Sequence, residues 1–582
     1  MFVVLKKLDW FFALNWKRYT VAIVLLIIAG ILDIIPPRLI GYTIDGISQG
    51  RLSEPDFYLI LGGMLAVTAV GYVVSYIWHY QLFGGAFALE RILRNRLMRH
   101  LLKMTPIFYE RNRTGDLMAR ATNDLRAVSL TAGFGILTLI DSSAFMLTIL
   151  IMMAGVISWK LTLVSLIPLP FIALVMTKLG KKIHERFMEA QDSFGELNDQ
   201  VLESIAGVRV IRAFVREEAS KAQFAAKTGE VLHKNLEVAK IDSLFEAIIK
   251  VLVGMSYLIG ISYGAYLVFR SEITLGELVT FNVFLGMLIW PMFAIGELIN
   301  IMQRGNASLD RVNETLGYKP EVEDAEATES VRTPEAIKFD RVTFRYPSSV
   351  TDNLSDVSIM LRKGQTLGIV GRTGSGKTTL LKQLLREYPL GEGTISISGV
   401  PIERLKIEEL LGWIGYVPQQ PILFSKTIRE NIFFGVKGER REEDLQRALA
   451  RASFAKDIAF LPDGLDTMVG EKGVALSGGQ KQRVSIARAL IADPEILMLD
   501  DALSAVDGKT EAEIIEGIRT ERKGKTTLIT THRLSAVQHA DLIIVLDNGR
   551  IVQQGTHEQL LLQGGWYREQ YERQQLESEL EQ

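Results

Sequence analysis

The sequence of 582 residues contains no cysteine. Disulfide bonds and cysteine-ligated metal sites are therefore excluded, although this absence does not decide the redox compartment. A strong excess of charge is missing as well, because 65 basic and 67 acidic residues leave a net charge of −2. Nothing in that balance favours a nucleic acid as a partner. The length exceeds what one hydrophobic core covers, so two or more domains are expected.

Also missing is a small-residue cleavage site after a short apolar run, so we expect no removable secretory leader. The first residues instead alternate basic side chains with large aromatic ones: Lys6, Lys7, Trp10, Phe11, Phe12, Trp16, Lys17 and Arg18. This mixture predicts an amphipathic helix at the membrane interface. A frayed soluble terminus is the alternative.

Long apolar runs fill the first half of the chain. A helix of about 20 residues crosses a bilayer. Six segments approach or exceed that length, at residues 19–35, 58–80, 134–158, 161–179, 244–269 and 278–302. An even number places both ends of this half on one side of the membrane. Three acids lie in or near these segments, namely Asp33, Asp141 and Glu297.

Acids inside a membrane are functional candidates. Asp33 precedes Pro36 and Pro37 near the expected outer end of its segment, where contact with water is the simpler explanation. An interhelical hydrogen bond is favoured for Asp141, with a direct cargo contact as the alternative. Glu297 fits either role.

Two long polar connections, around residues 90–130 and 180–240, carry most of the basic residues: Arg91, Arg94, Arg96, Arg99, Lys103, Arg111, Arg113, Lys181, Lys182, Arg186, Arg209 and Arg212. Basic residues at membrane ends stay in the cytoplasm. We therefore expect a multi-pass protein of the cell membrane, with both termini and the second half of the chain cytoplasmic. Helical periodicity continues into both connections, so the helices are predicted to project beyond the membrane.

The composition changes near residue 320. Residues 319–335 are rich in acids and predict a solvated linker. From residue 336 to 582 short β-type runs alternate with helical ones. The expected fold is thus an all-α domain of six membrane helices at 1–318, fused to a soluble α/β ATPase domain at 336–582. No repeat of 20–50 residues is evident, and residues 568–582 predict a charged helix that is solvated or contacts a partner.

A phosphate-binding loop follows the apolar strand 367–370 and precedes a helical run. It consists of Gly371, Arg372, Thr373, Gly374, Ser375, Gly376, Lys377 and Thr378, with Thr379 opening the helix. Glycines let backbone N–H groups close on phosphates, and the helix N-terminus adds positive potential. Lys377 is expected to reach the β- and γ-phosphates of ATP, and Thr378 to bind Mg²⁺.

Three further residues follow apolar strands. Asp500 ends the strand 496–500 and is expected to hold Mg²⁺ indirectly. Gln419, after 416–418, has an amide able to sense the metal or the attacking water. His532 follows the strand 527–531 and is placed to contact the γ-phosphate.

Asp501 occupies the position where an ATPase of this kind carries Glu to activate water. Asp is one methylene shorter, so its carboxylate is set back by roughly 1.5 Å. A displacement of about 1 Å at a reacting centre costs on the order of a hundredfold in rate. This chain is therefore predicted to hydrolyse ATP poorly at its own site. The alternative is that Asp501 acts as an ordinary base in an active homodimer.

A second anion site is predicted where Ser477, Gly478, Gly479 and Gln480 open a helical run. One chain needs only one phosphate loop, so the second site suggests phosphates presented by another molecule. A simple helix-capping turn is the alternative.

Together these motifs resemble the ATP-binding cassette (ABC) family, specifically exporter half-transporters with the type IV fold. The phosphate loop, Gln419, 476–480, Asp500, 504–507 and His532 match its Walker A, Q-loop, signature, Walker B, D-loop and H-loop in order. Tyr346 matches the aromatic residue that stacks on adenine, and 467–473 matches the exporter X-loop. Segments 108–117 and 207–214 match the two coupling loops.

The resemblance implies that two cassettes sandwich ATP between the Walker A of one and the signature of the other. It is strongest to MdlA- and BmrC-type subunits of bacterial heterodimeric multidrug exporters. It implies ATP and Mg²⁺ as cofactors, a homologous partner that carries the catalytic Glu, contact with membrane lipid, and a lipophilic small molecule as cargo. Lipid, peptide or siderophore export and a regulatory subunit are the alternatives, and an importer is disfavoured.

Overall fold

The computed structural model describes residues 3–324, 329–470 and 476–581. The chain forms two compact units. One comprises the residues up to His100 together with Gly115–Gly317, and the other comprises Leu101–Thr114 together with the residues from Tyr318 onward. The short segment Leu101–Thr114 lies inside the predicted membrane domain in sequence, yet it packs with the second unit.

In the described residues of the first unit, helices are joined by short turns and there is no strand. Among the described residues, five helical stretches are long and apolar enough to cross a membrane: Trp16–Ser48 (α3), Glu54–Leu101 (α4), Thr114–Leu166, Glu217–Phe269 (α13) and Leu275–Gly317. The predicted projection of the helices is confirmed, because α4 has 48 residues and α13 has 53. The stretch Leu275–Gly317 consists of α14 (Leu275–Met287) and α15 (Ile289–Gly317).

The stretch Thr114–Leu166 is the least regular. It contains α6 (Thr114–Ala119), α7 (Leu125–Ala132), α8 (Phe134–Ile140), α9 (Met146–Ile151) and α10 (Trp159–Leu166). Three π-helical turns interrupt the stretch, η1 (Arg120–Asp124), η2 (Asp141–Phe145) and η3 (Met152–Ser158), and Gly133 separates α7 from α8. The backbone changes direction between the predicted segments 134–158 and 161–179, since Ser158 is extended (φ −164°, ψ 119°) and caps α10.

The apolar segment predicted at 161–179 is helical but needs one correction, because it is not a single unbroken helix. The segment is divided between α10 and α11 (Leu169–Ala206), with Pro168 at the boundary. Proline has no N–H to continue the helical ladder, which explains the division. A second correction concerns α3, which continues through Pro36 and Pro37 to Ser48. Asp33 therefore lies in the middle of a helix instead of near its outer end.

The N-terminal residues form α1 (Val3–Lys7) and α2 (Asp9–Leu14). Val4, Leu8 and Phe11 are fully buried in the core shared with α3, α4 and α15, whereas Trp16 is exposed. Lys7 Nζ donates to Asn306 Oδ1 at 2.9 Å on α15. One face of this segment thus packs on the bundle and the other faces outward, as an amphipathic helix requires.

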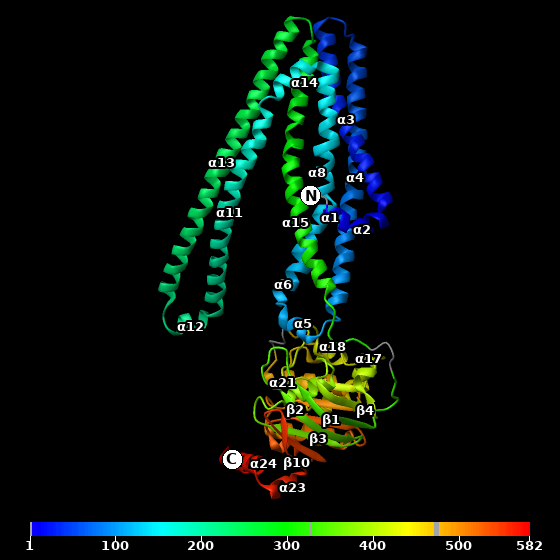
Figure 1. Cartoon of the computed structure of the whole chain (residues 1–582), viewed down its shortest axis with the longest axis vertical. Helices are drawn as coiled ribbons and strands as arrows, with labels where there is room; N and C mark the ends of the chain where they lie inside the picture. The colour runs from blue at the N-terminus through cyan, green and yellow to red at the C-terminus, as the bar shows by residue number, and fades with distance from the viewer. Residues whose placement is uncertain (1–2, 325–328, 471–475, 582) are drawn as a thin grey trace. The chain divides into compact units, whose positions relative to one another are not determined.

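Helices α11 and α13 run side by side and are joined by α12 (Val208–Ala213) (Figure 1). The short helices expected in the two coupling loops are present, as α5 (Pro106–Arg111), α6 and α12. No residue of α12 is buried.

The described part of the second unit contains two sheets. A four-stranded antiparallel sheet has the order β2–β1–β4–β5, formed by Leu354–Arg362, Ala336–Phe344, Glu392–Ile397 and Val400–Pro401. A six-stranded sheet has the order β10–β9–β3–β8–β7–β6, formed by Arg550–Gly555, Leu542–Asp547, Thr366–Gly371, Thr526–Thr530, Ile496–Asp500 and Ile414–Val417. Apart from β10, the strands of this second sheet are parallel.

Strands β7 and β8 are buried at every position, as is usual for parallel strands covered on both faces. Helix α16 (Lys377–Leu384), α21 (Gly478–Leu490), α22 (Gly508–Glu521) and α24 (Trp566–Glu581) supply much of that cover. The rigid sheet fixes where the strand ends lie, and the loops beyond those ends carry the predicted site.

Candidate functional site

Four parallel strands end at one edge of the six-stranded sheet, where ligands of open α/β sheets bind. The phosphate loop follows β3, Gln419 follows β6, Asp500 ends β7, and His532 comes two residues after β8. The structure therefore brings together, at a single edge, the site residues predicted from four separate parts of the sequence.

The phosphate loop needs glycine at particular positions. Gly376 has φ +104°, and a Cβ there would lie 2.6 Å from the carbonyl oxygen of Asn353. Gly371 has φ +149°, and its Cβ would lie 2.2 Å from the carbonyl oxygen of Leu546. Any side chain at either position would displace backbone. The loop accordingly runs tightly against its neighbours and then enters α16, as a phosphate cradle requires.

Lys377 folds back across this loop. Its Nζ donates to the carbonyl oxygens of Gly371 and Arg372, both at 2.9 Å. Burial lowers the pKa of Lys377, while the nearby carboxylates of Asp501 and Asp500 act in the opposite direction. The ammonium is thus held at the mouth of the loop, where phosphate oxygens can replace the carbonyls as its acceptors.

Asp500 is 1% exposed and its carboxylate is fully oriented by hydroxyl donors. Oδ1 accepts from Thr378 Oγ1 at 2.9 Å and from Thr530 Oγ1 at 2.7 Å. Oδ2 accepts from the hydroxyl of Tyr416 at 3.3 Å. Burial, followed by the Asp500 charge, raises the pKa of Tyr416, which keeps that hydroxyl protonated as a donor.

Magnesium suits this arrangement. No group of three or more acids or histidines suited to a metal occurs among the described residues. Mg²⁺ nevertheless needs few protein ligands, because it keeps several waters and takes further oxygens from nucleotide phosphates. The Thr378 hydroxyl beside the Asp500 carboxylate matches that hard-oxygen donor set.

Asp501 has its backbone held on both sides. It adopts φ +46°, a left-handed conformation that Asp tolerates better than most residues. Its N–H points at the carbonyl and the hydroxyl of Thr530, at 2.9 and 3.0 Å. Its carbonyl accepts from Ser504 Oγ at 2.9 Å. The main chain cannot slide forward to compensate for a short side chain, so reach is set by side-chain length.

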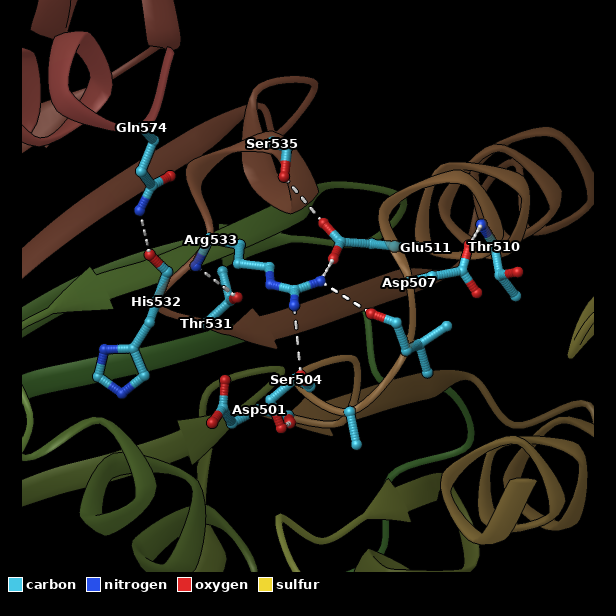
Figure 2. Close-up of polar contacts among 12 residues, drawn as sticks. Asp501, Ser504, Asp507, Thr510, Glu511, Thr531, His532, Arg533, Ser535 and Gln574 are labelled. Atoms are coloured by element: carbon cyan, nitrogen blue, oxygen red, sulfur yellow. Dashed lines mark hydrogen bonds and ion pairs between the residues drawn. The ribbon is translucent and has the colours of Figure 1, made fainter. Parts of the chain in front are cut away.

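Gln419 is brought next to Asp501 but contacts it only loosely, with Nε2 at 3.4 Å from Oδ2. His532 lies in the same region (Figure 2). Burial lowers the pKa of His532, and the positive charge of Lys377 lowers it further, with Asp501 opposing. A neutral imidazole at neutral pH can donate one hydrogen bond and accept another.

A contact to His532 from the C-terminal helix was missed by the sequence analysis. Gln574, on α24, donates through Nε2 to the carbonyl oxygen of His532 at 2.8 Å (Figure 2). Its Oε1 accepts from the N–H of Leu534 at 2.9 Å. Helix α24, the charged helix at the C-terminus, therefore holds the backbone of His532 in the H-loop in place. Nothing in its local sequence indicates this, because the contact joins distant parts of the chain.

Tyr346 lies in an aromatic cluster. Its ring packs edge-on against Phe344 and Tyr388, with centroids 5.0 and 4.9 Å apart, and its hydroxyl contacts Thr379 Oγ1 at 3.2 Å. The hydroxyl of Tyr388 donates to Glu110 on α5, within the same compact unit. The coupling helix thus reaches the aromatic cluster through one tyrosine.

The signature residues form the start of α21. Ser477 Oγ accepts from the N–H of Gln480 at 3.3 Å, and the Gln480 side chain bonds back to the N–H of Ser477 at 3.0 Å, forming a capping box. A Cβ on Gly478 would meet only Ala505 Cβ, at 3.7 Å. Among the described residues, no hydrogen bond joins 477–480 to the phosphate loop.

The D-loop, residues 504–507, is held by two side chains whose roles have no local signal in the sequence, Gln482 and Arg533. Gln482, on α21, accepts from the N–H of Ala505 at 3.0 Å and donates to Ser504 Oγ at 3.3 Å. Arg533 donates to Glu511 at 2.7 Å and to the carbonyl oxygen of Val506 at 2.9 Å (Figure 2). The predicted X-loop lies partly outside the described residues, at 471–473.

These features define a P-loop ATPase fused to a bundle of membrane helices. Residues 19–292 match the ABC transporter transmembrane region, and residues 354–504 match the ABC transporter ATPase family. The chain belongs to the ABC transporter family, as an exporter whose membrane and nucleotide-binding domains share one polypeptide. Its second unit is therefore an ATPase that binds ATP and couples hydrolysis to transport.

Curated relatives match over nearly the whole chain. Identity is 62% over 576 residues with the probable multidrug resistance ABC transporter ATP-binding/permease protein YheI of Bacillus subtilis, covering 99% of this chain and 98% of that protein. Identity is 42% over 578 residues with the multidrug resistance-like ATP-binding protein MdlA of Escherichia coli, covering 99% and 97%. An ATP-bound bacterial Atm1-family ABC exporter superposes with a TM-score of 0.78 at 26% identity, covering 96% of this chain and 99% of that chain.

Proposed function

We propose that this chain is one half of a heterodimeric exporter of lipophilic small molecules, in which it supplies the signature of the active ATP site. Its own Walker motifs hold ATP in a site that turns over slowly. The observation that carries this proposal is Asp501, whose main chain is hydrogen-bonded on both sides and whose carboxylate is one methylene short.

The cargo class rests on relatives that are named for multidrug resistance, YheI and MdlA. Lipid export is the second candidate, because an ATP-dependent lipid A-core flippase of Syntrophus aciditrophicus is 34% identical over 555 residues. Both cargoes are amphiphiles that partition into a bilayer, so a transport assay with each separates the two.

In the proposed mechanism, the chain's own site binds ATP without rapid hydrolysis. Lys377 and the phosphate-loop N–H groups orient the phosphates, and Thr378 with Asp500 orients Mg²⁺. Tyr346 supplies a ring face for adenine, and His532 offers a neutral imidazole to the γ-phosphate. The exposed start of α21 at Ser477 and Gly478 closes over the partner's ATP, where the partner's glutamate activates water.

We also propose the cytoplasmic placement of both termini and of the ATPase unit. It is supported by Arg91, Arg94 and Arg99 near the end of α4, because basic residues next to membrane helices remain in the cytoplasm. We place the domain boundaries at 1–318, 319–335 and 336–582, with α5 docking on the ATPase unit through Tyr388.

The test compares two substitutions in the purified complex of the chain with its partner. Asp501→Asn should lower ATPase activity only modestly, whereas Gly478→Glu should nearly abolish it, because the acid would face the γ-phosphate of the partner's ATP. Glu at the first turn of a helix is favourable, so α21 should remain folded.

Gly438→Glu is the matched control, because Gly438 has no heavy atom within 4 Å of its would-be Cβ. It should leave activity unchanged. Complete loss of turnover in Asp501→Asn alone would contradict the proposed division of labour.

A further inference from the structure

Helix α24 is anchored to the core of the ATPase unit near its first residue. The ring of Tyr567 is fully buried in the same core as Leu534, the first residue of η7 (Leu534–Val537). The Tyr567 N–H donates to Gln553 Oε1 on β10 at 3.1 Å. Gln574 follows Tyr567 by seven residues. This spacing is about two helical turns, so both side chains lie on the face of α24 that packs on the unit.

The side-chain amide of Gln574 holds the main chain of the H-loop at two points. Its Nε2 donates to the carbonyl oxygen of His532 at 2.8 Å, and its Oε1 accepts from the N–H of Leu534 at 2.9 Å. No other hydrogen bond to either of these backbone groups occurs among the described residues. One amide therefore fixes both peptide groups that flank Arg533.

The side chain of Arg533 contacts the D-loop. It donates to the carbonyl oxygen of Val506 at 2.9 Å and to Glu511 at 2.7 Å (Figure 2). Several rotatable bonds separate this guanidinium from the main chain, so the contact leaves the flanking peptide groups free to turn. The bridge from Gln574 is thus the direct restraint on these peptide groups.

The imidazole of His532 points away from Gln574, on the side of the H-loop where Asp501 lies (Figure 2). Burial and the charge of nearby Lys377 lower its pKa, so the ring lies beside the lysine of the phosphate loop. A displacement of about 1 Å at a reacting centre costs on the order of a hundredfold in rate. The orientation of the peptide group after His532 helps to set where the ring points, and Gln574 holds that peptide group.

We propose that Gln574 is a positioning residue for the ATP site, which keeps the imidazole of His532 directed at the γ-phosphate. The inference deepens the proposed function, because it rests on the contact between His532 and the γ-phosphate. It adds that the C-terminal helix, through one amide, sets how strongly this chain distinguishes ATP from ADP. Because ADP has no γ-phosphate, its affinity should not depend on Gln574.

The experiment measures the affinity of two nucleotides for the purified full-length chain in lipid nanodiscs, by calorimetry with Mg²⁺. One is a non-hydrolysable ATP analogue with a nitrogen bridge between the β- and γ-phosphates, and the other is ADP. Gln574→Met keeps the length of the side chain and removes both hydrogen bonds. It should weaken binding of the analogue about three- to tenfold, the worth of one hydrogen bond, and binding of ADP by less than about twofold.

A second substitution and a control accompany this variant. Gln574→Glu keeps the shape of the side chain and the acceptor for Leu534, but it loses the donor to His532, so it should show the same selective loss. Gln575→Met is the matched control, since Gln575 is exposed and donates to the hydroxyl of Tyr571 at 2.7 Å within α24. It should bind both nucleotides as the native chain does. Thermal unfolding of each variant verifies that the ATPase unit is intact.

A double-mutant cycle with His532→Ala separates positioning from packing. His532→Ala alone should weaken binding of the analogue at least about tenfold, because a hydrogen bond to a charged group is lost, and should change ADP binding by less than about twofold. In that background Gln574→Met should have no further effect on the analogue, because no imidazole remains to be directed.

Equal loss of the analogue and of ADP in the Gln574 variants would overturn the inference by showing a general packing role. Unchanged affinity for the analogue, or effects that add strictly to those of His532→Ala, would overturn it as well. Selective loss in His532→Ala with none in the Gln574 variants would overturn this inference and leave the proposed function standing. Absence of selective loss in His532→Ala would contradict the proposed contact with the γ-phosphate, and the inference with it.

Discussion

Replacing Asp501 with Glu should convert the slow ATP site into a hydrolytic one. The substitution adds one methylene and advances the carboxylate by roughly 1.5 Å. The main chain of residue 501 stays in place, because Thr530 and Ser504 hold its N–H and its carbonyl. The longer side chain should therefore extend toward the attacking water, because the backbone of the loop does not move back to offset the added length.

The expected gain follows from that displacement. A shift of about 1 Å at the reacting centre is worth on the order of a hundredfold in rate. This corresponds to about 2.7 kcal/mol of barrier, at 1.36 kcal/mol for each factor of ten. The cost to folding is smaller, because a left-handed conformation costs an L-residue about 1–2 kcal/mol and Asp already bears part of that cost.

The assay uses the purified complex loaded with radiolabelled ATP and Mg²⁺. Free nucleotide is removed rapidly, and hydrolysis of the retained ATP is followed in a single turnover. In the native complex the retained fraction should persist as triphosphate. In the Asp501→Glu complex it should decay about a hundredfold faster.

Asp356→Glu is the matched control for the backbone, since Asp356 is also left-handed (φ +51°) and exposed, on the antiparallel sheet. It should leave the decay of retained ATP unchanged. Identical decay in the native and Asp501→Glu complexes would refute the claim that carboxylate reach limits this site.

Three further predictions concern stability. The pKa of His532 lies below its ordinary value of 6.5 in the folded chain, so the unfolded chain binds more protons and stability falls as pH drops below 6.5. In thermal unfolding from pH 7.5 to 5.5, His532→Gln should therefore lose less stability than the native protein. An equal loss in the two proteins would contradict the lowered pKa of His532. Arg533→Ala leaves the Glu511 side chain, which is 4% exposed, without its cation and should lower the free energy of unfolding of the ATPase unit by about 1–3 kcal/mol. Adding Glu511→Gln to this variant should restore part of the lost free energy. Strictly additive effects of the two substitutions would argue against an Arg533–Glu511 ion pair. Gly276→Ala places a Cβ 1.9 Å from the carbonyl oxygen of Gly41 and should lower the free energy of unfolding of the helical unit by about 1–3 kcal/mol. Gly254→Ala is the control and should leave that free energy unchanged, because no heavy atom lies within 4 Å of its Cβ. Equal melting temperatures for the two variants would show that the α3–α14 contact is looser than described.

The ATP site could be predicted from the sequence because its parts are local. The phosphate loop, Asp500 and His532 each follow directly from a buried parallel strand, and parallel strands place their ends together. The order of the motifs then identified the family, which the relatives confirm.

Other features depend on contacts between distant residues and have no local signal. Gln574 donates to the backbone of His532 from a helix whose sequence shows only a charged pattern. Gln482 joins the signature helix to the D-loop. The cavity that Asp33 and Asp141 line together is of the same kind, since periodicity cannot show which helices are neighbours. Hydropathy also missed the division at Pro168, because apolar composition continues across the break.

The most direct test of the central claim is the ATPase activity of the full-length chain reconstituted alone in lipid, compared with the same amount of chain reconstituted with its partner. The account predicts almost no hydrolysis by the chain alone and strong, drug-stimulated hydrolysis by the pair. Rapid, drug-stimulated hydrolysis by the chain alone would contradict it, because Asp501 would then be a competent base.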